Sequence, residues 1–152
     1  MSMKFQVGSI VIDIVLDQAF MARVQGPWGR VSVSIASVAL ATDEFTALYP
    51  VLVELRSLHS RLSHHGAAST PTDPTYALRG ELSAHFGPGS KTEFLSGWCE
   101  AFDAIEAYVT AVDDTYVEVT AIRPSRARVT VRRDELSAWC QQSILELERH
   151  LV

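Results

Sequence analysis

The most regular apolar pattern in the chain runs from Thr92 to Val112. Large apolar side chains recur there at intervals of three and four residues, which places them on one stripe of an α-helix. They are Leu95, Trp98, Phe102, Ile105, Val109 and Val112. Acidic residues occupy positions on the other faces. The pattern predicts an amphipathic helix over 92–112 with an apolar inner side and an acidic outer side.

The same spacing predicts two further helices. One begins at Thr42, whose hydroxyl suits an N-cap, and Pro50 inside it should kink or split it. Its apolar stripe consists of Phe45, Leu48, Leu52, Leu55, His59 and Leu62. The other helix begins near Asp134, and its stripe consists of Leu136, Cys140, Ile144, Leu147 and Leu151.

Alternating apolar and polar residues between Phe5 and Ala36 predict a three-stranded antiparallel meander. Its strands are expected at Ile10–Leu16, Phe20–Val24 and Val31–Ile35. A three-residue loop after Leu16 would pair the first two strands and set Asp13 opposite Arg23. Phe5 and Val7 have the opposite parity to Ile10, which predicts a bulge or a strand start at Gly8.

The second half of the chain is expected to hold one more strand and a hairpin. The strand covers 76–86, and the hairpin covers Tyr116–Val131 around Pro124. A three-residue loop would set Glu118 opposite Arg132, Thr120 opposite Thr130 and Val119 opposite Val131. Residues 63–75 hold small residues and two prolines, which predicts a flexible loop.

These elements together predict a single α+β domain over residues 1–152. We expect an antiparallel β meander plus a later strand and hairpin, packed on one face by three amphipathic helices. The segments Leu95 to Cys99 and Leu136 to Cys140 echo each other, as Leu-Ser-Gly-Trp-Cys and Leu-Ser-Ala-Trp-Cys. We interpret the echo as two similar local solutions where a strand enters a helix.

Charge and composition narrow the function classes. The formal net charge is −5, and an acidic chain repels phosphate backbones, so we expect no nucleic-acid partner. No run of 18 apolar residues and no signal-peptide core occur, so we expect a cytoplasmic protein with no membrane partner. Arginine far outnumbers lysine, which suggests a bacterial source. Cys99 and Cys140 are expected to be buried reduced thiols.

The motifs of catalysis and cofactor binding are missing. The glycine turn before Lys91 lacks two of the glycines of a phosphate-binding loop, and the histidines near His59 have no metal-ligand spacing. We therefore expect no metal and no cofactor, and the sequence favours a protein that is not an enzyme. Five arginines between Arg123 and Arg133 are interpreted as a charged, exposed strand face.

The functional hypothesis is based on the excess of acidic residues in the 92–122 segment. This segment holds seven acidic residues and no lysine or arginine. We expect a non-catalytic binding protein, most concretely a bacterial immunity protein or inhibitor, that docks a basic protein through an acidic helix face. The candidate residues are Glu93, Glu100, Asp103, Glu106, Asp113 and Asp114.

A second hypothesis belongs to another class. The chain would then be a small-molecule-binding protein or an enzyme, with a pocket between helices and sheet near His59 and His85. A homodimer through exposed strand edges is compatible with either hypothesis.

Overall fold

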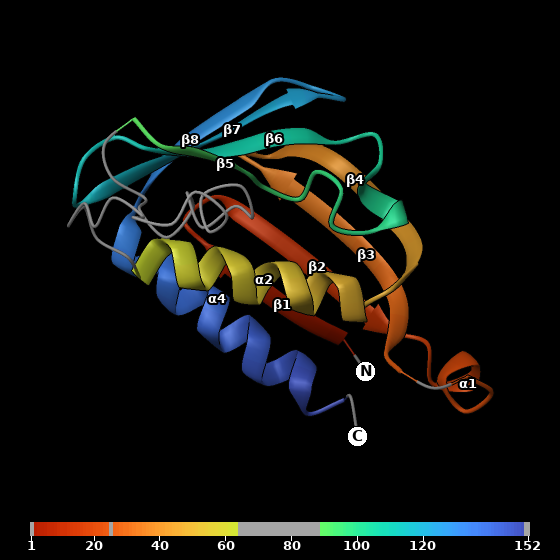
Figure 1. Cartoon of the computed structure of the whole chain (residues 1–152). Helices are drawn as coiled ribbons and strands as arrows, with labels where there is room; N and C mark the ends of the chain where they lie inside the picture. The colour runs from red at the N-terminus through yellow and green to blue at the C-terminus, as the bar shows by residue number, and fades with distance from the viewer. Residues whose placement is uncertain (1, 25, 64–88, 151–152) are drawn as a thin grey trace, which may run out of the picture.

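The computed structural model describes residues 2–24, 26–63 and 89–150, and its fold is mixed α+β (Figure 1). Each of two antiparallel sheets has four strands in chain order. The first sheet contains β1 (Ser2–Val7), β2 (Ile10–Leu16), β3 (Trp28–Ile35) and β4 (Val38–Ala47). The second contains β5 (Lys91–Glu93), β6 (Glu106–Ala111), β7 (Tyr116–Arg123) and β8 (Ala127–Arg132). The helices are α1 (Gln18–Met21), α2 (Tyr49–Ser63) and α4 (Arg133–Glu148), with a 3₁₀ turn η2 (Glu100–Phe102).

Each sheet is followed by one long helix, and these two helices lie side by side. Figure 1 shows α2 and α4 packed on each other, and α4 also contacts β1. The buried apolar residues of both sheets and both helices form one cluster. The expected layer of three amphipathic helices is not observed among the described residues, because only α2 and α4 are long helices and α1 has four residues, none of them buried. None of the described helices is long and apolar enough to cross a membrane.

The predicted helix over 92–112 is wrong. The segment forms β5, an irregular stretch with η2, and then β6, which pairs with β5 and β7. Ala107, Val109 and Ala111 are buried at a period of two, and the residues between them are half-buried. Leu95 and Gly97 have φ angles of 68° and 72°, which no right-handed helix accommodates. Strand pairing and these two residues therefore overrode the three-four spacing.

The first meander differs from the prediction at its middle strand. β2 pairs directly with β3, so Ile14 lies opposite Val31. Residues 20–24 form no strand, because Asp17 caps the short helix α1 by accepting a hydrogen bond from the Phe20 amide at 2.9 Å.

The first hairpin also explains the change of parity at Gly8. Val7 lies opposite Ile10 across a two-residue turn, Gly8 and Ser9, in place of the expected bulge or strand start. Gly8 has a φ angle of 55°, which suits a residue without a β-carbon in this turn. Both Val7 and Ile10 therefore face the core.

The first long helix begins later than predicted. β4 continues through Phe45 to Ala47, and α2 begins at Tyr49. Pro50 then stands in the first helical turn, where an amide hydrogen has no helical acceptor, so it causes neither a kink nor a split. The buried side of α2 consists of Val51, Leu52, Leu55, Leu58 and Leu62.

The late hairpin is present, but its predicted register is wrong by two residues. Val119 lies opposite Val129 and Glu118 opposite Thr130, because five residues separate the pair Ala121 and Ala127. The loop is odd, as expected, so both valine sets still share the inner face. The last helix begins at Arg133, one residue before the predicted start.

The two echo segments occupy different structures. The Leu95 segment lies in the irregular stretch, and the Leu136 segment lies inside α4. The strand expected at 76–86, the loop residues 64–75 and His85 lie outside the described residues.

Candidate binding surface

Three of the acidic residues lie on strands of the second sheet, and strand pairing brings an arginine beside two of them. Arg123 lies 3.6 Å from Glu106, and Arg128 lies 4.0 Å from Glu118. Glu93 on β5 lies opposite Tyr108. A run of acids that is uninterrupted in sequence is therefore largely balanced in space.

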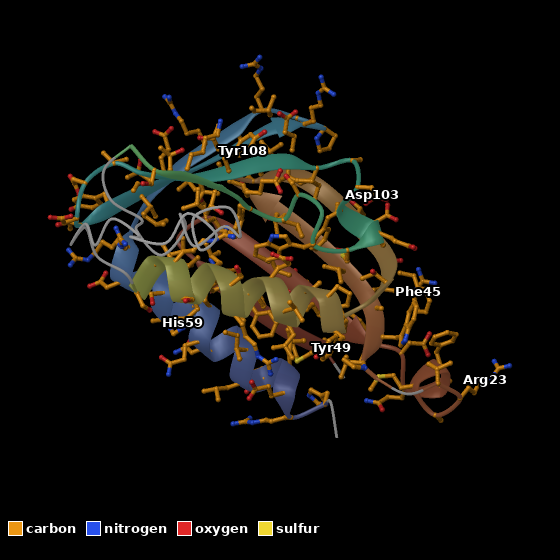
Figure 2. The ribbon with its side chains drawn as sticks, viewed as in Figure 1. Arg23, Phe45, Tyr49, His59, Asp103 and Tyr108 are labelled. Carbon is orange, nitrogen blue, oxygen red and sulfur yellow. The ribbon has the colours of Figure 1, made fainter. Side chains whose placement is uncertain are left out.

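Tyr108 contacts one acidic and one basic side chain on the outer face of this sheet (Figure 2). Its hydroxyl donates a hydrogen bond to Glu106 at 3.0 Å, and this bond raises the pKa of Tyr108. The Lys91 ammonium lies 3.8 Å from the centre of the Tyr108 ring, a cation–π contact. Glu106 and Glu118 on this face are already paired with arginines, which makes these two carboxylates less available to a basic partner, whereas Glu93 has no ion-pair partner among the described residues.

Asp113 and Asp114 stabilise the turn between β6 and β7. The Asp113 carboxylate accepts hydrogen bonds from the amides of Thr115 and Tyr116, both at 2.8 Å. Asp114 interacts electrostatically with the buried Arg133 and favours its charged form. These two acids have local structural partners.

Glu100 and Asp103 differ from Glu93 and Glu106 in position, because they lie outside the strands of the second sheet. Both are exposed on or beside η2, and within the described ranges neither has an ion-pair partner within 4 Å. The segment that presents them is held by side chains that are almost fully buried: Phe94, Leu95, Trp98, Phe102 and Ile105. The two carboxylates therefore stand on a well-anchored segment and are free to bind.

A hollow of about 500 Å³ lies between this segment and β4. Its walls include Trp28, Phe45, Thr46, Trp98, Glu100 and Asp103. Figure 2 places Phe45 and Asp103 at the same end of the molecule. The hollow thus combines aromatic surface with the two unpaired carboxylates.

The aromatic wall is a cluster of three rings from α1, β3 and β4. Trp28 and Phe45 stack with ring centres 5.3 Å apart, and Phe20 meets them edge-on at 5.0 and 5.2 Å. Phe45 keeps 38% of its surface exposed. Arg30 already lies 5.8 Å from the Phe45 ring centre and 3.7 Å from Asp43. One guanidinium group of the protein itself is thus already within cation–π distance of the wall.

Cys99 also borders the hollow, but its thiol is not suited to catalysis. Burial raises the pKa of Cys99, against the lowering effect of a hydrogen bond with Thr46. Burial raises the pKa of Cys140 in α4 as well. Both thiols are free, buried and protonated at neutral pH, so neither is an activated nucleophile.

The histidine pocket predicted from the sequence cannot be assembled from the described residues. His59 is half-buried on α2, and Figure 2 shows it far from Phe45 and Asp103. His85 lies outside the described residues. Among the residues that are described, no three His, Cys, Asp or Glu side chains are grouped so as to hold a metal ion.

Sequence reasoning found the two carboxylates but missed the aromatic wall. The sequence pattern places Phe45 on the buried stripe of a helix and leaves Trp28 outside the predicted strands. The aromatic wall could have been found by predicting that β4 extends to Ala47. This extension sets Trp28 opposite Ala47 and Phe45 opposite Arg30.

Comparisons with protein-family models, with curated proteins and with solved structures found no significant match to this chain.

Proposed function

We propose that this chain is a non-catalytic binding protein. It binds a basic segment of a protein partner, whose side chains can pack on aromatic rings, in the hollow between β4 and η2. In its most concrete form it is a bacterial immunity protein or inhibitor that covers a basic surface of its partner. One observation carries the proposal: Glu100 and Asp103 are exposed beside the Trp28–Phe45 wall and have no ion-pair partner among the residues that the structure describes.

The chemistry of the hollow favours arginine over other side chains. A guanidinium is planar and can stack on an aromatic ring while its N–H groups bind carboxylates. Trp28 and Phe45 supply the ring faces, and Glu100 and Asp103 supply the acceptors. An arginine followed by an apolar residue would use both parts of the hollow.

The charge of the hollow should act mainly on the rate of association. Exposed carboxylates attract a basic partner over about 8–10 Å at physiological ionic strength. Once bound, one or two side chains in a hollow of about 500 Å³ make a limited contact. A partner bound only here would therefore bind weakly and exchange quickly, whereas a tight inhibitor complex would need additional surface.

The proposal is tested by titrating the ¹⁵N-labelled protein with a short peptide of alternating arginine and phenylalanine. We expect amide shifts to concentrate at residues 97–103, at Trp28 and at 45–47. The control peptide replaces each arginine by glutamate and should leave these amides unchanged. Shifts that follow the outer face of the second sheet, or equal responses to both peptides, would reject this hollow as the site.

A further inference from the structure

The outer edge of β1 has backbone hydrogen-bonding groups that no other described strand uses. β1 is the outer strand of the first sheet, and within the described part of the chain it pairs only with β2. A two-residue turn makes Val7 and Ile10 a hydrogen-bonded pair, and such pairs alternate along the hairpin. Ser2, Lys4 and Gln6 therefore direct their backbone N–H and C=O groups away from β2, toward the free edge.

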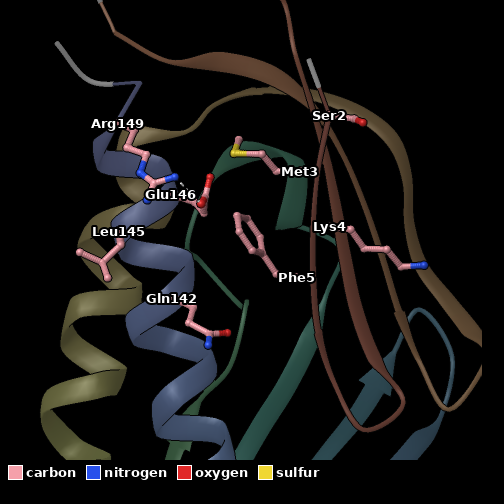
Figure 3. A pocket seen from close by; sticks show the side chains of 8 residues that line it. All are labelled: Ser2, Met3, Lys4, Phe5, Gln142, Leu145, Glu146 and Arg149. Atoms are coloured by element: carbon pink, nitrogen blue, oxygen red, sulfur yellow. Dashed lines mark hydrogen bonds and ion pairs between the residues drawn. The ribbon is translucent and has the colours of Figure 1, made fainter.

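A hollow of about 440 Å³ lies between this strand and α4 (Figure 3). The strand contributes Met3 and Phe5 to it. The helix contributes Gln142, Leu145, Glu146 and Arg149, whose spacing of three, four and seven residues forms one stripe. Leu145 is 52% exposed, the most exposed large aliphatic residue among those described. The edge thus offers backbone hydrogen bonds and an apolar contact next to each other.

We propose that a second copy of this chain pairs antiparallel along β1 and forms a homodimer. The buried faces of the two strands lie on the same side of the joint sheet only if odd-numbered residues lie opposite odd-numbered ones and even-numbered residues opposite even-numbered ones. The two-fold axis must therefore be centred on a residue and not between two residues. Centring the pair on Lys4 would set two ammonium groups directly opposite, which is unfavourable. Centring it on Phe5 sets Lys4 opposite the partner subunit's Gln6, so the free backbone groups of Lys4 and Gln6 bond each other.

The same two-fold axis brings the two α4 helices together. Leu145, which is 52% exposed on α4, is a side chain that contact between the two helices would shield from water. Glu146 and Arg149, which pair within one helix at 2.9 Å, can pair across the axis instead. Such an interface uses one self-complementary patch on both copies, as two-fold dimers require. Since β4 forms the opposite edge of the first sheet, the Trp28–Phe45 hollow stays accessible.

Sedimentation equilibrium of the full chain over a concentration series tests the dimer. We expect a mass of twice 16.8 kDa. Lys4→Pro removes an edge N–H without breaking the β1–β2 ladder, and Leu145→Glu buries a charge, so each should weaken the dimer about tenfold or more. Lys4→Gln and Val53→Glu are the controls, because neither removes a contact of the proposed interface, and both should remain dimeric.

Cysteine cross-linking tests the register. Mixed Lys4→Cys and Gln6→Cys proteins should form a disulfide-linked heterodimer under mild oxidation, and wild type should form none because its thiols are buried. A cross-link confined to Lys4→Cys alone would overturn the Phe5-centred register. A monomer at every concentration would overturn the dimer.

Discussion

Arg133 shows how one residue can join two helices. It stands at the first position of α4, yet its side chain is 1% exposed. Its Nε donates a hydrogen bond at 2.9 Å to the carbonyl of Leu62, in the last turn of α2. A cation suits that end of a helix, where carbonyl groups lack helical partners. Burial lowers the pKa of Arg133, and the charge of Asp114 opposes this effect.

We predict that Arg133→Ala lowers the free energy of unfolding by about 2–4 kcal/mol, because buried carbonyls at the end of α2 lose their donor. Urea denaturation followed by circular dichroism measures the loss. Arg132→Ala is the matched control, since Arg132 is exposed and pairs with an exposed Asp134. Equal midpoints for the two variants would show that Arg133 does not hold α2 and α4 together.

The buried thiols predict how stability depends on pH. Burial raises the pKa values of Cys99 and Cys140 above 9.0, so the unfolded chain releases these protons at lower pH than the folded one. The unfolded state therefore binds fewer protons above about pH 9, and the free energy of unfolding falls as pH rises. Urea midpoints at several alkaline pH values should decline for wild type and decline less steeply for Cys99→Ala/Cys140→Ala. Parallel slopes would contradict this account.

At the scale of elements, the turn between β3 and β4 shows the clearest backbone strain. Ala36 and Ser37 have φ angles of 51° and 65°, the pattern of a type I′ turn, although neither is glycine. Residues with a β-carbon are disfavoured in this conformation by about 1–2 kcal/mol. The pairing of Ile35 with Val38, both part of the apolar packing, holds the turn in place.

We predict that Ser37→Gly stabilises the protein by about 1 kcal/mol, because glycine adopts this φ without strain. The same replacement within β3, Ser34→Gly, should destabilise it by about 0.5–1 kcal/mol, because glycine gains conformational freedom in the unfolded chain. Thermal unfolding of both variants gives the two signs. A loss of stability in Ser37→Gly would contradict the assigned turn.

The elements also show what a single sequence can and cannot specify. The late hairpin and α4 were predictable because their local patterns agree with their tertiary contacts. The 92–112 segment was misassigned because apolar residues at 102, 105, 109 and 112 fit a helix while those at 107, 109 and 111 fit a strand. Only the neighbouring strands β5 and β7 decide between the two. The carboxylate side of the hollow could be predicted from the sequence, but its aromatic side could not. The aromatic side depends on the pairing of β3 with β4, which brings Trp28 beside Phe45.

At the scale of the molecule, the first sheet has two edges with different properties. Within the described residues, the β1 edge has backbone groups that pair with no other strand, and it lies near an exposed leucine on α4. The β4 edge carries the aromatic wall and faces Glu100 and Asp103. On the second sheet, Glu106 and Glu118 are paired with Arg123 and Arg128. This division predicts that a basic partner binds at the β4 edge and that self-association occurs at the β1 edge.

The most direct test of this account is surface plasmon resonance with the arginine–phenylalanine peptide at low and physiological salt. We predict that Glu100→Lys/Asp103→Lys weakens binding about tenfold or more, chiefly through slower association, and that wild-type association slows as salt rises. The control Glu93→Lys/Glu135→Lys changes the net charge equally at exposed sites outside the hollow and should lose much less affinity. Equal losses in the two variants, or wild-type association that does not respond to salt, would contradict binding at the Trp28–Phe45 hollow.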